Sequence, residues 1–217
     1  MTQAALSPIR RGVSLAHEVT ERLRLAILAG DFAEGAALPE AQTALRLGVS
    51  RVPVREALAE LERRGLVEFD AHGRARVKTF TEEDVREILS LRAALQAMAA
   101  GLAASKLTPG DVERLEDILR RAERTRDLAK FSALDSAFHD EIVAIARHRR
   151  LARAWTDLRS QMDFWLARLH RRRENARHDV RPVTLKSHRE IVAVLKTRRP
   201  EAAARRLEKH CAWEPLP

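Results

Sequence analysis

The stretch LGVSRVPVREAL at residues 47–58 decides how this chain is interpreted. Gly48 suits the tight turn that ends one helix. Ser50 suits the N-cap of the next helix, because its hydroxyl can accept a bond from a free backbone N–H. Pro53 falls in the first turn of that helix, where its missing N–H costs little. The segment therefore predicts a turn followed by a helix that begins near Arg51.

The helix predicted to begin at residue 51 has two unlike faces. Four apolar residues recur at i, i+3, i+4 and i+7 and form a stripe suited to a buried core, namely Val54, Ala57, Leu58 and Leu61. Arg51 and Arg55 lie one turn apart and point away from that stripe. An exposed basic N-terminal end is where a helix-turn-helix reader contacts DNA, so the pattern predicts DNA binding. The alternative is an amphipathic core helix that carries two arginines by chance.

The composition favours helices. The chain has 217 residues, 45% of them hydrophobic but only 4% aromatic, and it contains a single cysteine. This composition is typical of an all-helical protein, and one cysteine excludes an intramolecular disulfide. No apolar run approaches the ~20 residues of a membrane span, and residues 1–12 contain no secretion signal. The sequence therefore predicts a cytoplasmic protein that does not enter a membrane.

The chain is basic, with 40 Lys and Arg against 31 Asp and Glu and a net charge of +9. A basic balance is expected of a nucleic-acid-binding protein. Residues 1–78 hold 12 basic and 10 acidic side chains, so most of the excess lies in residues 79–217. The densest basic cluster, residues 168–181, is expected to be a solvated helix end and loop, with auxiliary phosphate contact as the other interpretation.

Periodicity and capping residues predict a mostly α protein in three parts. We expect a flexible arm at residues 1–12, a winged helix-turn-helix domain at residues 13–80 and an all-helical antiparallel bundle at residues 81–217. The second part is expected to hold helices at residues 14–29, 41–47 and 51–64 and short strands at residues 66–69 and 75–79. The third is expected to hold six helices, one from residue 81 to at least 102 and others over residues 108–126, 130–146, 151–170, 184–196 and 200–211.

The order of motifs in residues 14–80 resembles the GntR family of bacterial transcription regulators. The shared pieces are an apolar helix, Gly30-Asp31-Phe32, Leu38-Pro39-Glu40, Gly48–Leu58 and Gly65-Leu66-Val67. The resemblance implies a homodimer that binds a pseudo-palindromic double-stranded operator, with DNA contacts from Ser50, Arg51, Val52, Pro53 and Arg55. It also implies contacts from the wing at His72, Gly73 and Arg74, although family wings usually carry glycine at the position of Arg74.

Asp135 and His139 form a polar pair in the helical part. They are four residues apart, so both side chains leave one face of a helix, at the edge of its apolar stripe. His188 and His210 lie on the last two predicted helices, which a short turn joins and which are expected to pack as neighbours. Taken singly, each histidine is more simply a structural or surface residue. The Asp135–His139 pair is expected to point toward a seam between helices.

Residues 81–211 resemble the FCD domain, the effector domain of FadR-type GntR regulators. The shared pieces are Asp135-x-x-Phe138-His139, Ser187-His188-x-x-Ile191 and a terminal His210. In metal-binding members one Asp and three His hold a divalent ion, which implies the ligands Asp135, His139, His188 and His210. Such a set suits Zn²⁺, which we favour, and also Ni²⁺ or Mn²⁺. Arg92 is expected to assist effector binding, and Gln96 replaces a glutamate that is frequent in the family.

The combined interpretation is a DNA-binding transcription regulator, in this family most often a repressor. A small carboxylate bound at the metal is expected to favour one spacing of the two DNA domains and so alter operator affinity. One alternative is a regulator for which the metal ion itself is the signal. Another is a metal-dependent hydrolase, but the sequence has no H-E-x-x-H motif and no general base apart from the proposed ligands. We therefore predict that the chain is not an enzyme.

Overall fold

In the computed structural model of this chain, residues 14–175, 179 and 181–211 are described, without the side chains of residues 167–175. The flexible arm predicted for residues 1–12 lies outside that part. The chain divides into two compact units, Met1–Lys78 and Thr79–Pro217.

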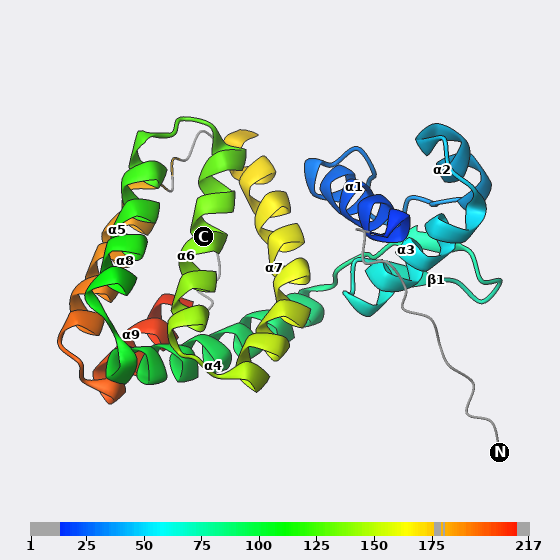
Figure 1. Ribbon diagram of the computed structural model, residues 1–217. Helices are drawn as coiled ribbons and strands as arrows, with labels where there is room; N and C mark the ends of the chain where they lie inside the picture. Colours follow the sequence, from blue (N-terminus) through cyan, green and yellow to red (C-terminus); the bar gives the residue numbers. More distant parts are fainter. Residues whose placement is uncertain (1–13, 176–178, 180, 212–217) are drawn as a thin grey trace, which may run out of the picture. The chain divides into compact units, whose positions relative to one another are not determined.

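The described part of the first unit holds three helices and one antiparallel strand pair (Figure 1). Their bounds are α1 Leu15–Ala29, α2 Glu40–Leu47, α3 Arg51–Arg63, β1 Val67–Phe69 and β2 Ala75–Val77. Gly48 ends α2 at φ 66°, a left-handed conformation that glycine adopts without a Cβ clash. Val67 pairs with Val77, so the two strands form the small wing predicted after the third helix.

The apolar stripe of α3 forms the centre of the first unit. The four residues predicted for this stripe are fully buried, namely Val54, Ala57, Leu58 and Leu61. They pack in a unit where α3 contacts α1, α2 and β1. Burial of these four apolar side chains fixes one face of α3 in the core and leaves the opposite face exposed to solvent.

The described part of the second unit is helical, with six helices (Figure 1). Their bounds are α4 Glu82–Lys106, α5 Pro109–Arg124, α6 Leu128–Ile145, α7 Arg149–Asn175, α8 Arg181–Lys196 and α9 Pro200–Cys211. Thr81 and Thr108 form capping boxes at the starts of α4 and α5. Helix α7 runs five residues beyond its predicted end, so part of the basic cluster at residues 168–181 is helical; its side chains up to residue 178 lie outside the described part.

Helix α4 is the central element of the bundle, because it contacts α6, α7, α8 and α9. Four alanines on α4 are fully buried, namely Ala99, Ala100, Ala103 and Ala104. The expectation that no segment could span a membrane needs correction, since α4 meets that test by length and composition alone. Arg92 is the single charge in residues 88–105. Helix α4 nevertheless packs against four other helices, as the core helix of a bundle does.

Candidate functional site

The N-terminal end of α3 carries an exposed surface. Arg51, Val52 and Arg55 are all exposed, and Val52 shows 63% of its surface to solvent. Pro53 is buried instead, because it lies beside Val54 on the core side of the helix, so the contact predicted for its side chain is not supported. Ser50 occupies the N-cap position with no capping bond from its side chain, against expectation. The exposed Ser50 hydroxyl is therefore not committed to the backbone of α3.

Glu40, the first residue of α2, connects the two arginines of α3. Its carboxylate accepts bonds from Nε and Nη2 of Arg55, each at 3.0 Å, and one from Nη2 of Arg51 at 3.5 Å. The hydrogen bond from Arg55 is the main cause that lowers the pKa of Glu40. The sequence interpretation treated Glu40 only as part of a family motif. The position of an acidic residue at the start of α2, the helix before α3, could have indicated this contact.

The turn of the wing is organised by Asp70. Its carboxylate accepts bonds from the backbone N–H groups of His72 and Arg74, at 2.9 and 3.0 Å. These backbone bonds, with that of Arg74 the largest cause, lower the pKa of Asp70 to about 2. Gly73 adopts φ 71° at the tip. The three predicted wing residues are exposed, and the guanidinium of Arg74 is bound to Asp70 at 2.8 Å.

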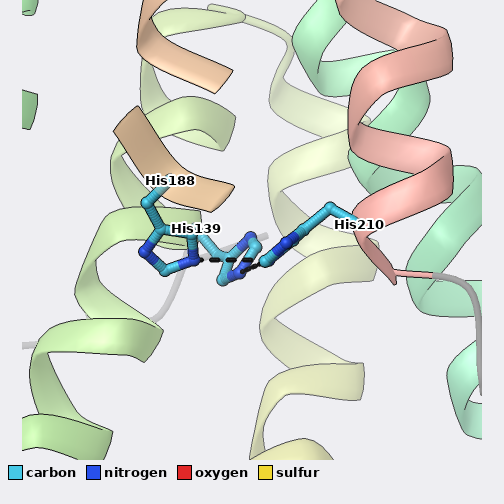
Figure 2. Close-up of side chains that lie close together, drawn as sticks. All are labelled: His139, His188 and His210. Atoms are coloured by element: carbon cyan, nitrogen blue, oxygen red, sulfur yellow. Dashed lines mark hydrogen bonds between the residues drawn. The ribbon is translucent and has the colours of Figure 1, made fainter. Parts of the chain in front are cut away.

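Three histidines from three helices converge in the second unit, as Figure 2 shows. His139 lies on α6, His188 on α8 and His210 on α9. The Nε2 atom of His210 lies 3.3 Å from Nε2 of His188 and 3.3 Å from Nε2 of His139. One ligand atom from each residue lies within 4.8 Å of the others, so the three rings could hold a metal ion.

Asp135 lies beside this cluster, one helical turn before His139 on α6. Its Oδ1 is 3.4 Å from Nε2 of His188, and only 10% of its side chain is exposed. The close group comprises the three imidazoles, and Asp135 joins it through His188. The structure thus brings all four residues predicted as ligands into one region of the bundle.

Gln96 on α4 fixes which ring nitrogen of His139 faces the cluster. The amide nitrogen of Gln96 donates to the backbone carbonyl of His139 at 3.4 Å, so its Oε1 faces Nδ1 of the ring at 3.2 Å. An amide oxygen only accepts, so Nδ1 must carry the proton and Nε2 must present a lone pair. This is the arrangement that metal-ligating histidines use. The sequence interpretation missed this contact.

Ser187 contacts the outer ring nitrogen of His210. The Ser187 hydroxyl lies 2.7 Å from Nδ1 of the ring, and it accepts a bond from Nη2 of Arg206 at 2.8 Å. The ring of His188 stacks on Phe138 with 4.1 Å between ring centres. Each of the three rings is therefore oriented by a neighbour outside the cluster.

The three imidazoles are held in their neutral form. Burial is the main cause that lowers the pKa of each ring, to about 3 for His188 and His210 and well below the usual range for His139. The positive charge of Arg92 contributes to all three shifts. A neutral ring is the form that binds a metal, so no proton has to leave at neutral pH.

Arg92 on α4 is buried beside the cluster, with only 8% of its surface exposed. Its Nη2 lies 2.8 Å from Nε2 of His139 and donates to it, because a guanidinium has no acceptor. Its Nε is buried with no hydrogen-bond partner among the described residues. The residue predicted to assist an effector therefore lies within the same region as the proposed metal ligands.

Comparison with known proteins agrees with this architecture. Residues 15–77 match the bacterial regulatory proteins of the gntR family, and residues 87–212 match the FCD domain. The "Probable D-xylose utilization operon transcriptional repressor" of Paenarthrobacter nicotinovorans is 31% identical over 207 residues, which cover 92% of this chain and 86% of that protein. The "Gluconate operon transcriptional repressor" of Bacillus licheniformis is 26% identical over 89% of this chain and 79% of that protein.

A solved structure resembles the whole fold. "E. coli McbR/YncC" matches with a TM-score of 0.78 and 25% identity, over 92% of this chain and 94% of that one. The two matched domains together account for both units of the chain. The chain belongs to the GntR family of bacterial transcriptional regulators, carries an FCD domain and is a regulator rather than an enzyme.

Proposed function

We propose that this protein is a cytoplasmic transcriptional repressor that binds a pseudo-palindromic operator as a homodimer. Two relatives are named as operon repressors, which supports repression rather than activation. A homodimer would present two copies of α3 to successive major grooves, which explains why an operator of two related half-sites is expected.

The DNA contacts that we propose come from α3 and the wing. Arg51 and Arg55 are exposed and reach bases or phosphates, while the uncommitted hydroxyl of Ser50 suits a phosphate. Val52 offers apolar surface to a thymine methyl group. The wing tip, residues 72–74, offers an exposed imidazole and guanidinium to the backbone of the duplex.

We further propose that the histidine cluster holds a divalent ion. The ligands would be Asp135, His139, His188 and His210, a set that suits Zn²⁺ best and also Ni²⁺ or Mn²⁺. When bound, the ion supplies a Lewis-acid position for the carboxylate of a small organic acid. The buried guanidinium of Arg92, which contacts His139, would bind the same acid. Binding of the acid would then shift the protein toward a state with a different operator affinity.

One observation carries this proposal. Three neutral imidazoles from α6, α8 and α9 turn their Nε2 atoms toward a common point inside a protein that has a separate DNA-binding unit. The outer nitrogens of two rings are bonded to Gln96 and Ser187, which is the arrangement that metal-ligating histidines use.

The test begins with an operator recovered by selecting bound sequences from a pool of random duplexes. Operator affinity is then measured for metal-loaded and chelated protein, with and without a panel of small carboxylic acids. We expect an acid that changes operator affinity only when the metal is present, and a His139→Ala variant that binds DNA but ignores the acid. A change of affinity with metal alone would instead identify the ion as the signal.

The matched control is His17→Ala, which removes an exposed histidine from the first unit. It should leave the response to the acid unchanged. An acid response that survives chelation and the His139→Ala substitution would contradict the proposed metal-dependent mechanism.

A further inference from the structure

The guanidinium of Arg92 occupies the lone pair that a metal ion would need. A neutral imidazole has one proton-bearing nitrogen and one acceptor nitrogen. In His139, Nδ1 carries the proton toward Gln96, so Nε2 is the acceptor. Nη2 of Arg92 donates to it at 2.8 Å and lies closer to it than Nε2 of His210, at 3.3 Å. A Zn²⁺ ion bound to that nitrogen would lie at about 2.0–2.1 Å in the same direction. Arg92 and a metal ion therefore exclude each other at His139.

Displacement of Arg92 from His139 would leave its buried positive charge without the hydrogen-bond acceptor that this ring provides. The guanidinium is almost fully buried, and its Nε already lacks a hydrogen-bond partner among the described residues. Losing the bond to His139 would leave a second nitrogen unsatisfied beside a newly arrived divalent cation. An unpaired buried charge is costly, and two nearby cations repel each other. An anion that contacts both cations would remove the two penalties together.

The geometry of Arg92 indicates which anion fits. Its unsatisfied Nε and its displaceable Nη2 form one edge of the guanidinium fork. The same edge of Arg55 binds the Glu40 carboxylate with two bonds of 3.0 Å, and that of Arg181 binds the Asp179 carboxylate at 2.8 and 2.9 Å. The freed edge of Arg92 is thus complementary to a carboxylate, which has two oxygens at the matching spacing.

We propose that Arg92 blocks the metal position at His139 and couples metal binding to carboxylate binding. Arg92 would leave His139 when an ion is bound there, and its freed fork would then hold the carboxylate of a small acid. Each ligand therefore tightens the binding of the other. This inference rests on the metal site proposed above and adds the reason why metal and acid act together.

The test measures Zn²⁺ affinity of the full chain by competition with a chromophoric chelator. Sodium acetate is the probe, with sodium chloride at matched ionic strength as its reference. For the wild type we expect acetate to tighten Zn²⁺ binding about 10-fold, within the range usual for coupled sites. Without acetate, Arg92→Met should bind Zn²⁺ about 10-fold more tightly than the wild type, as expected if Arg92 leaves about one tenth of the sites free. Acetate should then have little effect on this variant.

Two further variants separate charge, fork and fold. Arg92→Lys keeps a cation without the fork, so it should bind Zn²⁺ about as the wild type does and show a reduced acetate effect. Lys196→Met removes an exposed cation of the same unit that is paired with Glu116, and it should change neither quantity. Circular dichroism melting curves verify that each variant is folded.

The outcomes distinguish this inference from the function on which it rests. If the wild type takes up no metal, the proposed metal site is wrong and this inference falls with it. If the wild type binds Zn²⁺ but Arg92→Met binds it equally or more weakly, or responds to acetate as the wild type does, only the role of Arg92 is overturned.

Discussion

The N-terminal end of α3 and the histidine cluster of the bundle arrange charge in opposite ways. On α3, two exposed arginines share the single carboxylate of Glu40. In the cluster, three neutral imidazoles and an acidic neighbour lie together, and the buried guanidinium of Arg92 contacts one of the rings. Exposed ion pairs exchange partners at little cost, because water solvates each charge. Buried groups must have their donors and acceptors matched in advance. The surface is therefore suited to capture a polyanion, and the interior to select one small ligand.

The largest expected effect on the exposed side comes from Arg55. Arg55→Ala should weaken binding to the selected operator by about 1–3 kcal/mol, because it removes a contact to bases or phosphates. Fluorescence anisotropy with labelled operator measures this directly. Arg63→Ala, at the opposite end of α3 and also exposed, is the matched control. Wild-type affinity in the Arg55 variant would show that this face does not read DNA.

On the buried side, Gln96→Leu should weaken Zn²⁺ binding by about 10- to 100-fold. The substitution removes the acceptor that keeps the proton on Nδ1 of His139, so Nε2 no longer presents its lone pair reliably. Gln96→Glu, which retains an acceptor at this position, should recover most of the affinity. Equal Zn²⁺ affinity in Gln96→Leu and the wild type would mean that the ring orientation is not set by this contact.

Glu40→Gln should produce a smaller change of a different kind. It removes the negative charge that competes with phosphates for Arg51 and Arg55, so binding to non-specific DNA should strengthen by about 10-fold or less. Loss of the two-bond contact should also let Arg55 move, which lowers the ratio of specific to non-specific affinity. An unchanged ratio at two salt concentrations would indicate that Glu40 has no part in positioning Arg55.

The smallest effect concerns the wing turn. The pKa of Asp70 is lowered to about 2, so its contribution to wing stability is complete above about pH 4 and is lost as the pH falls through about 2. An NMR titration of the Asp70 carboxyl, with the amide signals of His72 and Arg74 as reporters, measures this value. Titration near the ordinary 3.8 would contradict the bonding described for the turn.

The sequence predicted features that depend on local spacing better than features that depend on packing between distant segments. The burial of Val54 and Leu58 and the exposure of Arg55 follow from helical periodicity, and the structure confirms them. The burial of Pro53 was missed because the face it occupies depends on how α3 packs. Contacts of Glu40 with Arg55, across 15 positions, had no periodic signal at all.

The candidate metal site shows the same division. Family resemblance suggested four ligand residues, and the structure brings them together. The orienting roles of Gln96 and Ser187 were not predicted. Gln96 contacts His139 from 43 positions away in the sequence, and Ser187 contacts His210 from 23 positions away. The direct contact between Arg92 and His139 was also not predicted, since burial of an arginine in a helix cannot be derived from its neighbours in sequence.

We propose above all that the bundle of this GntR-family regulator holds one metal ion at its histidine cluster. Elemental analysis of purified, tag-free protein tests it most directly, with metal per chain compared between the wild type and His188→Ala. We predict close to one equivalent of a divalent metal in the wild type and its loss in the variant. A wild type that holds no metal, even after incubation with Zn²⁺, Ni²⁺ and Mn²⁺, would contradict the account.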